Sequence, residues 1–136
     1  MVKYLLFMNR YNTCYLGGLS SYSLVLMIVA FFQHKYQSPC DCNAQPTAIL
    51  LRNFFQFYGY EFDYNSKVIS VTNGGQFHDR QVKGWSNPTL PLSLSIEDPN
   101  HPENVTPSLP FIYFLHHILF PFHFPAKYPF RLLNPN

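Results

Sequence analysis

Two serines and a tyrosine stand together at the expected start of an apolar helix. Ser20, Ser21 and Tyr22 follow the pair Gly17-Gly18 and precede an apolar run. A serine in such a place caps a helix, and the free N–H groups and dipole of that helix end attract anions such as phosphate. An aromatic ring beside it can stack on any nucleic-acid base. On the residues alone, helix caps and a core tyrosine remain the simpler interpretation.

The acidic residues predict no complete catalytic metal site. Asp41, Asp63 and Asp79 are isolated in the sequence, and Glu97 and Asp98 are adjacent to each other. Two-metal phosphoryl transfer needs several carboxylates that converge on ions about 3.5–4 Å apart. The chain also lacks the glycine spacing of a P-loop or a dinucleotide fingerprint. We therefore expect neither a metal site nor a catalytic residue within this chain.

The composition is typical of a single aromatic-rich domain. The chain has 136 residues, of which 47% are hydrophobic and 12% charged, with a net charge of +2. That length fits one domain, and so small a net charge does not by itself identify a nucleic-acid-binding protein. The apolar run 24–32 is much shorter than the roughly 20 residues that span a membrane. We expect a soluble protein. The alternative is a small membrane-associated protein, because the C-terminal part is rich in phenylalanine.

Three helices are predicted in the first 60 residues. Residues 2–12 form a plausible short helix. Ser20 is a good N-cap for a second helix that runs to about His34. This helix is apolar nearly all round and should therefore be central in its domain. Pro46 suits the first turn of a third helix, and Gly59 suits its C-terminal stop.

Short strands are predicted after the helices. Segments 61–64 and 68–71 alternate with period two around three polar residues, which predicts a β-hairpin. Asn73-Gly74-Gly75 predicts a turn. Residues 92–96 alternate again, and the acidic and proline residues that follow should end that strand. From Val105 onward the chain has many prolines and no periodicity, so no secondary structure is expected there. The predicted fold class is α+β, mainly helical, with a small β-hairpin and an irregular C-terminal tail.

Four motifs resemble, in order and spacing, those of the atypical poly(A) RNA polymerases, which are terminal nucleotidyltransferases with a PAP-associated domain. They are G-G-L-S-S-Y-S-L at 17–24, L-L-R-N-F-F-Q-F-Y-G at 50–59, the hairpin and N-G-G turn at 62–75, and I-E-D-P at 96–99. In the family the last of these opens the nucleotide-recognition motif. The resemblance covers about residues 2–105 and is closest to the nuclear, exosome-linked branch. It implies that the fold is a partial central, or PAP-associated, domain.

The resemblance implies five nucleotide-binding residues. Lys3 and Ser21 would hold the triphosphate, for which a compact ammonium group is suited. Tyr22 would stack on the incoming base. Asn104 would read the base edge, because an amide offers both a donor and an acceptor, and Asp98 would support that loop.

The chain departs from the family pattern on both sides of this segment. The family's catalytic module, with its G-S motif and three metal-binding acids, is missing, and Phe7 stands where some branches have a second lysine. After Asn104 the family continues to V-G-R-S-S, whereas this chain reads V-T-P-S. We divide the chain into a partial nucleotide-recognition domain, 1–105, and a Phe/Pro-rich tail, 106–136. We expect Met1 to be an internal start and the tail to be translated intron or a shifted frame.

The resemblance implies the nucleotide-recognition part of an RNA 3′-end nucleotidyltransferase that acts in polyadenylation and RNA surveillance and is inactive alone. ATP with Mg²⁺ or Mn²⁺ is expected for the complete enzyme. The implied partners are an RNA 3′ end, a zinc-knuckle RNA-binding subunit and an exosome-linked helicase, without a membrane. The location would be nuclear or cytoplasmic, and the family branch favours the nucleus. The alternative is a non-enzymatic ATP-binding or protein-interaction module.

Overall fold

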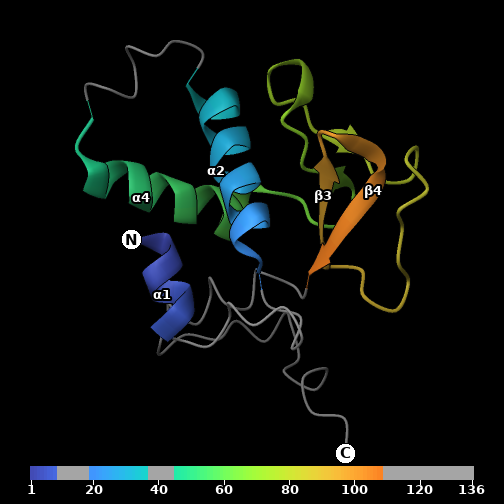
Figure 1. Cartoon of the computed structure of the whole chain (residues 1–136), viewed down its shortest axis with the longest axis horizontal. Coiled ribbons are helices and arrows are strands. Elements are labelled where there is room, and N and C mark those ends of the chain that lie inside the picture. Colours follow the sequence, from blue (N-terminus) through green and yellow to red (C-terminus); the bar gives the residue numbers. More distant parts are fainter. Residues whose placement is uncertain (9–18, 37–44, 109–136) are drawn as a thin grey trace, which may run out of the picture.

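A computed structural model describes residues 1–8, 19–36 and 45–108, and these form an α+β fold. Its helices are α1 (Val2–Met8), α2 (Ser21–Lys35) and α4 (Thr47–Gln56). Its strands are β1 (Lys67–Val68), β2 (His78–Asp79), β3 (Leu94–Asp98) and β4 (His101–Ser108). In Figure 1 the helices and the strands lie on opposite sides, and α2 stands between α4 and the β3–β4 pair. The predicted fold class is confirmed. The predicted first helix is present as 2–8, and residues 9–12 lie outside the described part.

Helix α2 is central on one face only. Met27, Ala30 and Phe31 are fully buried, as expected of a helix that is apolar nearly all round. On its other face, Val25 is 55% exposed and Val29 is 39% exposed. The second helix is therefore confirmed in its position and in its buried face, while part of its apolar surface lies on the outside of the described fold.

Helix α4 begins where it was predicted and continues past its predicted end. Pro46 directly precedes it, as its fixed φ and missing N–H favour. The chain then passes through Gly59 in a π-helical turn, Phe57–Glu61, so the prediction of a stop at Gly59 is wrong. Burial of aromatic side chains explains the difference. Tyr58 is fully buried and its hydroxyl donates to the carbonyl oxygen of Met27 at 2.8 Å, which ties the extra turn to α2.

Edge-to-face aromatic contacts fill the space between α2 and α4. The ring centroids of Phe31 and Phe54 are 5.6 Å apart, and those of Phe54 and Tyr58 are 5.0 Å apart. Such pairs contribute about 0.5–1.5 kcal/mol each beyond the area that they bury. The aromatic residues of the third predicted helix are thus core residues.

The predicted hairpin between 61–64 and 68–71 is wrong. Strand β1 pairs antiparallel with β2, and residue 61 belongs to the π-helical turn. Phe62 and Tyr64 are both buried, with ring centroids 4.9 Å apart in an edge-to-face contact. The period-two pattern over 61–64 therefore reflects two aromatic rings buried beside a turn, and not a strand.

The turn predicted at Asn73-Gly74-Gly75 is confirmed. All three residues have positive φ, at 50°, 80° and 81° in chain order. This left-handed backbone favours glycine, which has no Cβ to clash with the following carbonyl oxygen. Gly75 also lies against α2, because a Cβ there would be 2.6 Å from the Cβ of Gln33. The turn therefore packs on α2. Glycine is needed at position 75 both for its left-handed backbone and for its close approach to α2.

Strands β3 and β4 form an antiparallel pair that begins at Leu94↔Ser108. The strand predicted at 92–96 is confirmed for 94–96; it begins at Leu94 and continues through Glu97 and Asp98 instead of ending before them. The expectation of no secondary structure from Val105 onward is wrong for 105–108, which belong to β4. Pro107 is compatible with this position, since a proline is tolerated on an edge strand that has a free side. The remainder of the predicted tail, 109–136, lies outside the described residues.

A buried arginine organises the long segment between β2 and β3. Arg80 is only 2% exposed, and its guanidinium donates to three backbone carbonyls at 2.7–3.0 Å, those of Tyr64, Trp85 and Pro91. It also donates to the hydroxyl of Ser93 at 2.6 Å. A buried polar group must be hydrogen-bonded in this way to be tolerated. The arginine therefore fixes the path of the chain into β3.

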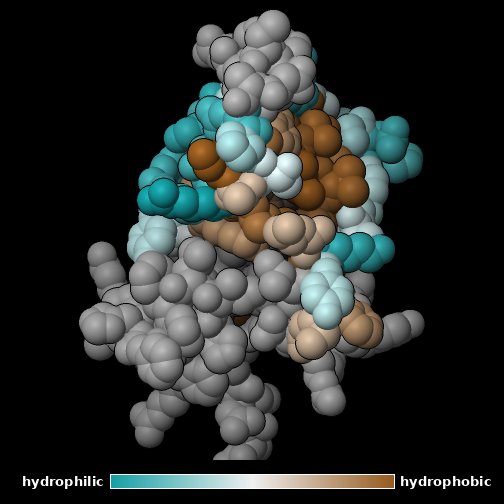
Figure 2. Space-filling model, turned by 90° about the vertical axis from the view of Figure 1, so that its left-hand side faces the viewer, coloured by the Kyte–Doolittle hydropathy of each residue, from teal (hydrophilic) through white to brown (hydrophobic). Residues whose placement is uncertain are grey.

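The helical side of the molecule carries apolar residues on its surface. Figure 2 shows a brown area on this side, bordered by hydrophilic residues. Large apolar side chains that are more than a third exposed on this side include Met1, directly before α1, and Tyr4, Phe7, Met8, Tyr22, Val25, Val29 and Ile49 in α1, α2 and α4. Within the described residues, no helix combines the length and the apolar character that crossing a membrane requires.

Candidate functional site

Within the described part of the chain, the start of α2 presents the Ser21 side chain at the surface. The backbone N–H of Ser23 donates to Oγ of Ser20 at 2.9 Å, so Ser20 is the N-cap, as predicted. Ser21 is the next residue and is exposed. Its side chain has no hydrogen-bond partner among the described residues. The two serines therefore divide their roles, because one caps the helix and the other presents a hydroxyl beside the helix N-terminus.

Lys3 and Ser21 line the same groove, although 18 positions separate them in the chain. The groove lies between α1, α2 and α4 and has a volume of about 430 Å³. Its walls are largely apolar, with Leu24, Phe31 and Phe54 among the lining residues. Lys3 and Ser21 thus bring a cation and a hydroxyl to a surface that is otherwise mostly hydrophobic.

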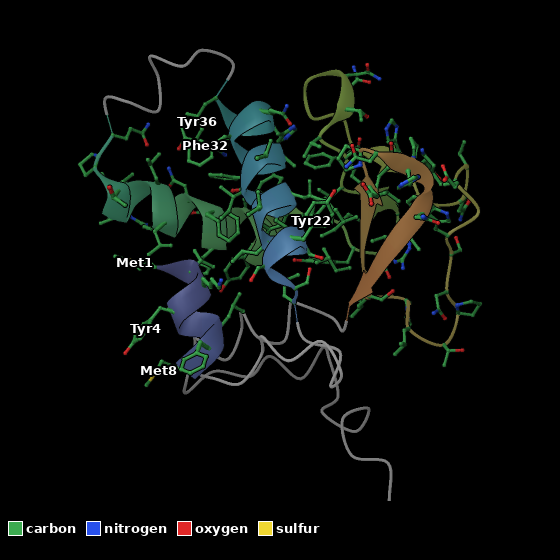
Figure 3. The ribbon with its side chains drawn as sticks, viewed as in Figure 1. Met1, Tyr4, Met8, Tyr22, Phe32 and Tyr36 are labelled. Atoms are coloured by element: carbon green, nitrogen blue, oxygen red, sulfur yellow. The ribbon has the colours of Figure 1, made fainter. Side chains whose placement is uncertain are left out.

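Tyr22 is joined to the β3–β4 pair by a direct hydrogen bond. Its hydroxyl donates to Oδ1 of Asp98 at 3.0 Å, across 76 positions of sequence. In Figure 3 the labelled Tyr22 points from α2 toward the strands, whereas Phe32 and Tyr36 lie on the α4 side. The ring remains 44% exposed, so its face is open to a ligand. Two of the five predicted site residues are therefore in contact.

Hydrogen bonding shifts the pKa values of both groups in opposite directions. The hydrogen bond to Asp98 is the main cause that raises the pKa of Tyr22 above 10.0, and desolvation raises it further. The backbone N–H of Asn100, which donates to Asp98 at 2.9 Å, is the main cause that lowers the pKa of Asp98 below 3.8. At neutral pH the tyrosine is therefore a donor and the aspartate an acceptor.

Asn104 lies in an irregular part of β4, next to this contact in sequence. Asp98 pairs with His101, whereas the preceding Glu97 pairs with Val105. Residues 102–104 of β4 therefore form a bulge opposite the link between Glu97 and Asp98 in β3. Asn104 is exposed, and no hydrogen bond joins it to Tyr22 or Asp98 in the described part of the chain. Its predicted role as a base reader remains a prediction.

Two features near the site were not found from the sequence. Asn100 contributes its backbone N–H to Asp98. The Asp-Pro-Asn string could have indicated this turn, because an aspartate often accepts from the N–H two residues later. The second feature is Glu97, a 4% exposed carboxylate whose Oε2 lies 2.7 Å from Nζ of Lys83. Adjacent strand residues face opposite sides, so Glu97 anchors the strand while Asp98 faces α2.

The described residues do not form a divalent-metal site. Among the described residues there is no group of three or more His, Cys, Asp or Glu side chains that could hold a metal ion. The described site can thus contact a nucleotide through a cation, hydroxyls, an aromatic ring and amides, but it offers no carboxylate cluster for metal-assisted chemistry.

Known proteins similar to this chain include several poly(A) RNA polymerases. A family model described as Cid1 family poly A polymerase matches residues 47–104. The poly(A) RNA polymerase cid14 of Schizosaccharomyces pombe is 38% identical over 101 residues, which cover 73% of this chain and 15% of that protein. The inactive non-canonical poly(A) RNA polymerase protein Trf4-2 of Drosophila melanogaster is 34% identical over 110 residues, which cover 76% of this chain and 26% of that protein. This chain spans well under a third of the length of these relatives.

Solved structures of the same group share the fold. The polymerase core of TRAMP, an RNA surveillance complex, superimposes with a TM-score of 0.61 at 22% identity, covering 86% of this chain and 37% of that one. The structure of Cid1 in complex with the UTP analogue UMPNPP gives a TM-score of 0.58 at 27% identity, covering 72% of this chain and 41% of that chain. The resemblance predicted from the sequence motifs is confirmed.

Proposed function

The chain belongs to the atypical, Cid1-type poly(A) RNA polymerase family, and we propose that its described part recognises the incoming nucleotide for RNA 3′-end extension. The observation that carries this proposal is the hydrogen bond between Tyr22 and Asp98. It joins an exposed aromatic ring at the start of α2 to the turn that follows β3. These two motifs are the ones that the family resemblance assigns to nucleotide recognition.

The proposed binding mode gives each residue one task. Lys3 and Ser21 contact the triphosphate, since an ammonium group and a helix N-terminus both favour phosphate. Tyr22 stacks on the base, Asp98 holds the ring, and Asn104 reads the base edge. ATP is the proposed nucleotide, in keeping with the poly(A) polymerase names of the relatives.

In this proposal, residues other than the described ones bind the metal ion. Extension of RNA by this family needs a divalent ion, Mg²⁺ or Mn²⁺, at the reacting phosphate. Because the described residues offer no metal-binding cluster, we route no catalytic step through them. In this proposal the domain 1–105 binds the nucleotide, and the tail 106–136 has no assigned role.

Nucleotide affinity tests this proposal directly. A fluorescent ATP analogue titrated onto the full chain should bind saturably, and unlabelled ATP should compete for it. Tyr22→Ala should weaken binding about 5- to 150-fold, the equivalent of a base stack of about 1–3 kcal/mol. Tyr22→Phe should retain most of the affinity, and Lys67→Ala, at an exposed lysine outside the groove, serves as the matched control. Equal affinity in Tyr22→Ala and the control would contradict the proposal.

A second candidate function is a non-enzymatic ATP-binding or interaction module. The similarity to the Drosophila relative named as inactive favours it, as does the lack of a metal-binding cluster among the described residues. We expect the purified chain, with ATP and Mg²⁺, not to extend a labelled RNA. Extension that is abolished by Tyr22→Ala would rule out this candidate and restore an enzymatic one.

The proposed partners follow from the same family. An RNA 3′ end is proposed as the second ligand, with a zinc-knuckle RNA-binding subunit and an exosome-linked helicase as protein partners. The structural similarity to the polymerase core of TRAMP supports this choice. A nuclear location is proposed on the same ground. Co-purification of the tagged chain with such a subunit, together with imaging of the tag, tests both.

A further inference from the structure

We propose that Lys83 is a positioning residue for the nucleotide site, because its ion pair with Glu97 fixes the end of β3 from which Asp98 holds Tyr22. This inference rests on the proposed function, and it adds a residue that the family resemblance does not assign to the site. Lys83 lies in the segment between β2 and β3, and its side chain is 28% exposed. It acts on Tyr22 through the strand and not by touching it.

The first step of the argument is that the two faces of β3 meet different parts of the molecule. Successive residues of a strand point to opposite faces. Leu94 and Ile96 lie in the core cluster that also contains the buried face of α2, and Asp98, on the same face, accepts from the Tyr22 hydroxyl at 3.0 Å. Glu97 is on the opposite face and is 4% exposed. The strand can therefore be held from one face while the other face builds the site.

The second step is that one short segment, 80–83, holds this opposite face at both ends. Arg80 donates to the hydroxyl of Ser93, directly before β3, at 2.6 Å. Nζ of Lys83 lies 2.7 Å from Oε2 of Glu97, near the other end of the strand. The same ammonium group lies 5.5 Å from the ring centroid of Trp85, a cation–π contact that restrains it further. Lys83 is therefore itself fixed, as a residue that positions another must be.

The third step is that this end of β3 depends on the ion pair. The backbone N–H of Glu97 donates to the carbonyl oxygen of Ile69 at 2.9 Å, and directly afterwards the pairing with β4 shifts register, between Glu97 and Asp98. Among the described residues, Oε2 of Glu97 accepts no hydrogen bond of standard geometry, and besides Lys83 it faces only Nε2 of His78, at 3.6 Å. A buried carboxylate needs a charge partner. Without Lys83, we expect Glu97 to move toward water and to displace Asp98 with it.

The fourth step connects the strand to the ligand. Tyr22 is 44% exposed, and the hydrogen bond to Asp98 holds the far end of its ring. A tyrosine side chain that is free to change its rotamer would lose entropy when a base stacks on it. Holding the hydroxyl removes part of that cost before the nucleotide arrives, which is how preorganisation increases affinity. A displaced Asp98 should therefore weaken stacking on Tyr22.

A spectroscopic measurement tests the positioning without any nucleotide. The full chain is labelled with tyrosine carrying ¹³C at Cζ, and Tyr22→Phe identifies the Tyr22 resonance at pH 7. Its position in Asp98→Ala marks the ring whose hydroxyl has lost its acceptor. Lys83→Met should move the resonance toward that position, whereas Lys67→Met, at an exposed lysine in β1, should leave it in place. An unmoved resonance in folded Lys83→Met would overturn the proposal.

A second variant covers the case in which Lys83→Met does not fold, because it leaves a buried charge without its partner. The double variant Lys83→Met with Glu97→Gln removes the ion pair and the buried charge together. The Tyr22 resonance should move in this variant too. A resonance that stays at its position in the unmodified chain would show that the ion pair does not position Asp98.

A double-mutant cycle then tests whether the positioning serves binding. With the fluorescent ATP analogue, Lys83→Met should weaken binding about 2- to 5-fold, the equivalent of a weak hydrogen bond. In the Tyr22→Phe background the same change should have no further effect, because the hydroxyl through which Lys83 acts is absent. An equal loss in both backgrounds would overturn the positioning role. If the resonance moves but the unmodified chain does not bind the analogue, the proposed function fails, and the positioning of Tyr22 by Lys83 stands.

Discussion

The hydroxyl of Tyr22 gives this candidate site its most specific chemistry. An exposed tyrosine at a helix start is usually an ordinary surface residue, and the sequence alone favours a core position for Tyr22. What distinguishes this tyrosine is that its hydroxyl bonds a carboxylate 76 positions away, which connects the two motifs of the proposed nucleotide site. Phenylalanine at this position would keep the stacking face and lose the connection.

The connection between Tyr22 and Asp98 should depend on pH in a defined direction. The pKa of Asp98 is lowered, chiefly by the backbone N–H of Asn100 and further by the Tyr22 hydroxyl. A carboxylate whose folded-state pKa is lowered stabilises the fold above its unfolded pKa, and this contribution is lost as the pH falls through the folded pKa. We therefore expect the contact to be complete at pH 5 to 7 and to be lost at a pH below the ordinary carboxylate value of 3.8.

Carboxyl ¹³C NMR of the full chain measures this titration, with Asp98→Asn identifying the resonance. The midpoint should lie below 3.8, and it should move toward that value in Tyr22→Phe. A midpoint at or above the ordinary value in the unmodified chain would contradict the hydrogen bonds on which the site is built.

At the residue scale, motif matching supplied the residues of the candidate site, and the structure shows which of them lie together. Ser20 is the predicted cap, and Lys3 and Ser21 do share one groove. Asn100, whose backbone N–H donates to Asp98, was missed. Its turn was readable from Asp-Pro-Asn, but the partner of that turn depends on the tertiary fold.

The turn at 73–75 shows how one element locates another. Gly74 and Gly75 have nearly the same positive φ, 80° and 81°, but only Gly75 lies against α2. A Cβ at Gly74 would meet no atom within 4 Å, whereas one at Gly75 would be 2.6 Å from the Cβ of Gln33. Alanine substitutions at these two glycines therefore separate the cost of backbone strain, which both share, from the cost of a steric clash, which only Gly75 has.

We expect Gly74→Ala to lower the free energy of unfolding by about 1–2 kcal/mol, the cost of a left-handed alanine. Gly75→Ala should lower it by about 2–5 kcal/mol, since the displacement of α2 is added to the same strain. Urea denaturation of the two variants, followed by far-UV circular dichroism, measures the difference. Equal losses would mean that the turn does not pack on α2 as described.

At the element scale, capping and turn residues predicted secondary structure better than the alternation of apolar and polar residues did. Ser20 and the glycine turn act through local backbone geometry, which is present in the sequence itself. The hairpin prediction failed because Phe62 and Tyr64 alternate for a different reason, namely that both rings are buried in one aromatic core. The end of α4 was missed similarly, because burial of Tyr58 outweighs the tendency of Gly59 to stop a helix.

For the molecule as a whole, the arrangement places the proposed nucleotide site at the start of α2, between the helices and the β3–β4 pair. The apolar groove that contains Lys3 and Ser21 lies on the α1 and α4 side, and Tyr22 reaches toward the strands on the other side (Figure 3). A nucleotide held by all of these residues would therefore lie across the N-terminal end of α2. Its triphosphate would be on the groove side and its base toward the turn after β3.

The measurement that tests this account most directly is photolabelling of the full chain with 8-azido-ATP, followed by peptide mapping. The account predicts adducts on the peptide that contains Tyr22 and on residues 98–104, suppressed by excess ATP and much reduced in Tyr22→Ala. Asn65→Ala should label like the unmodified chain. Labelling at other peptides, or labelling that excess ATP does not suppress, would contradict nucleotide recognition at the start of α2.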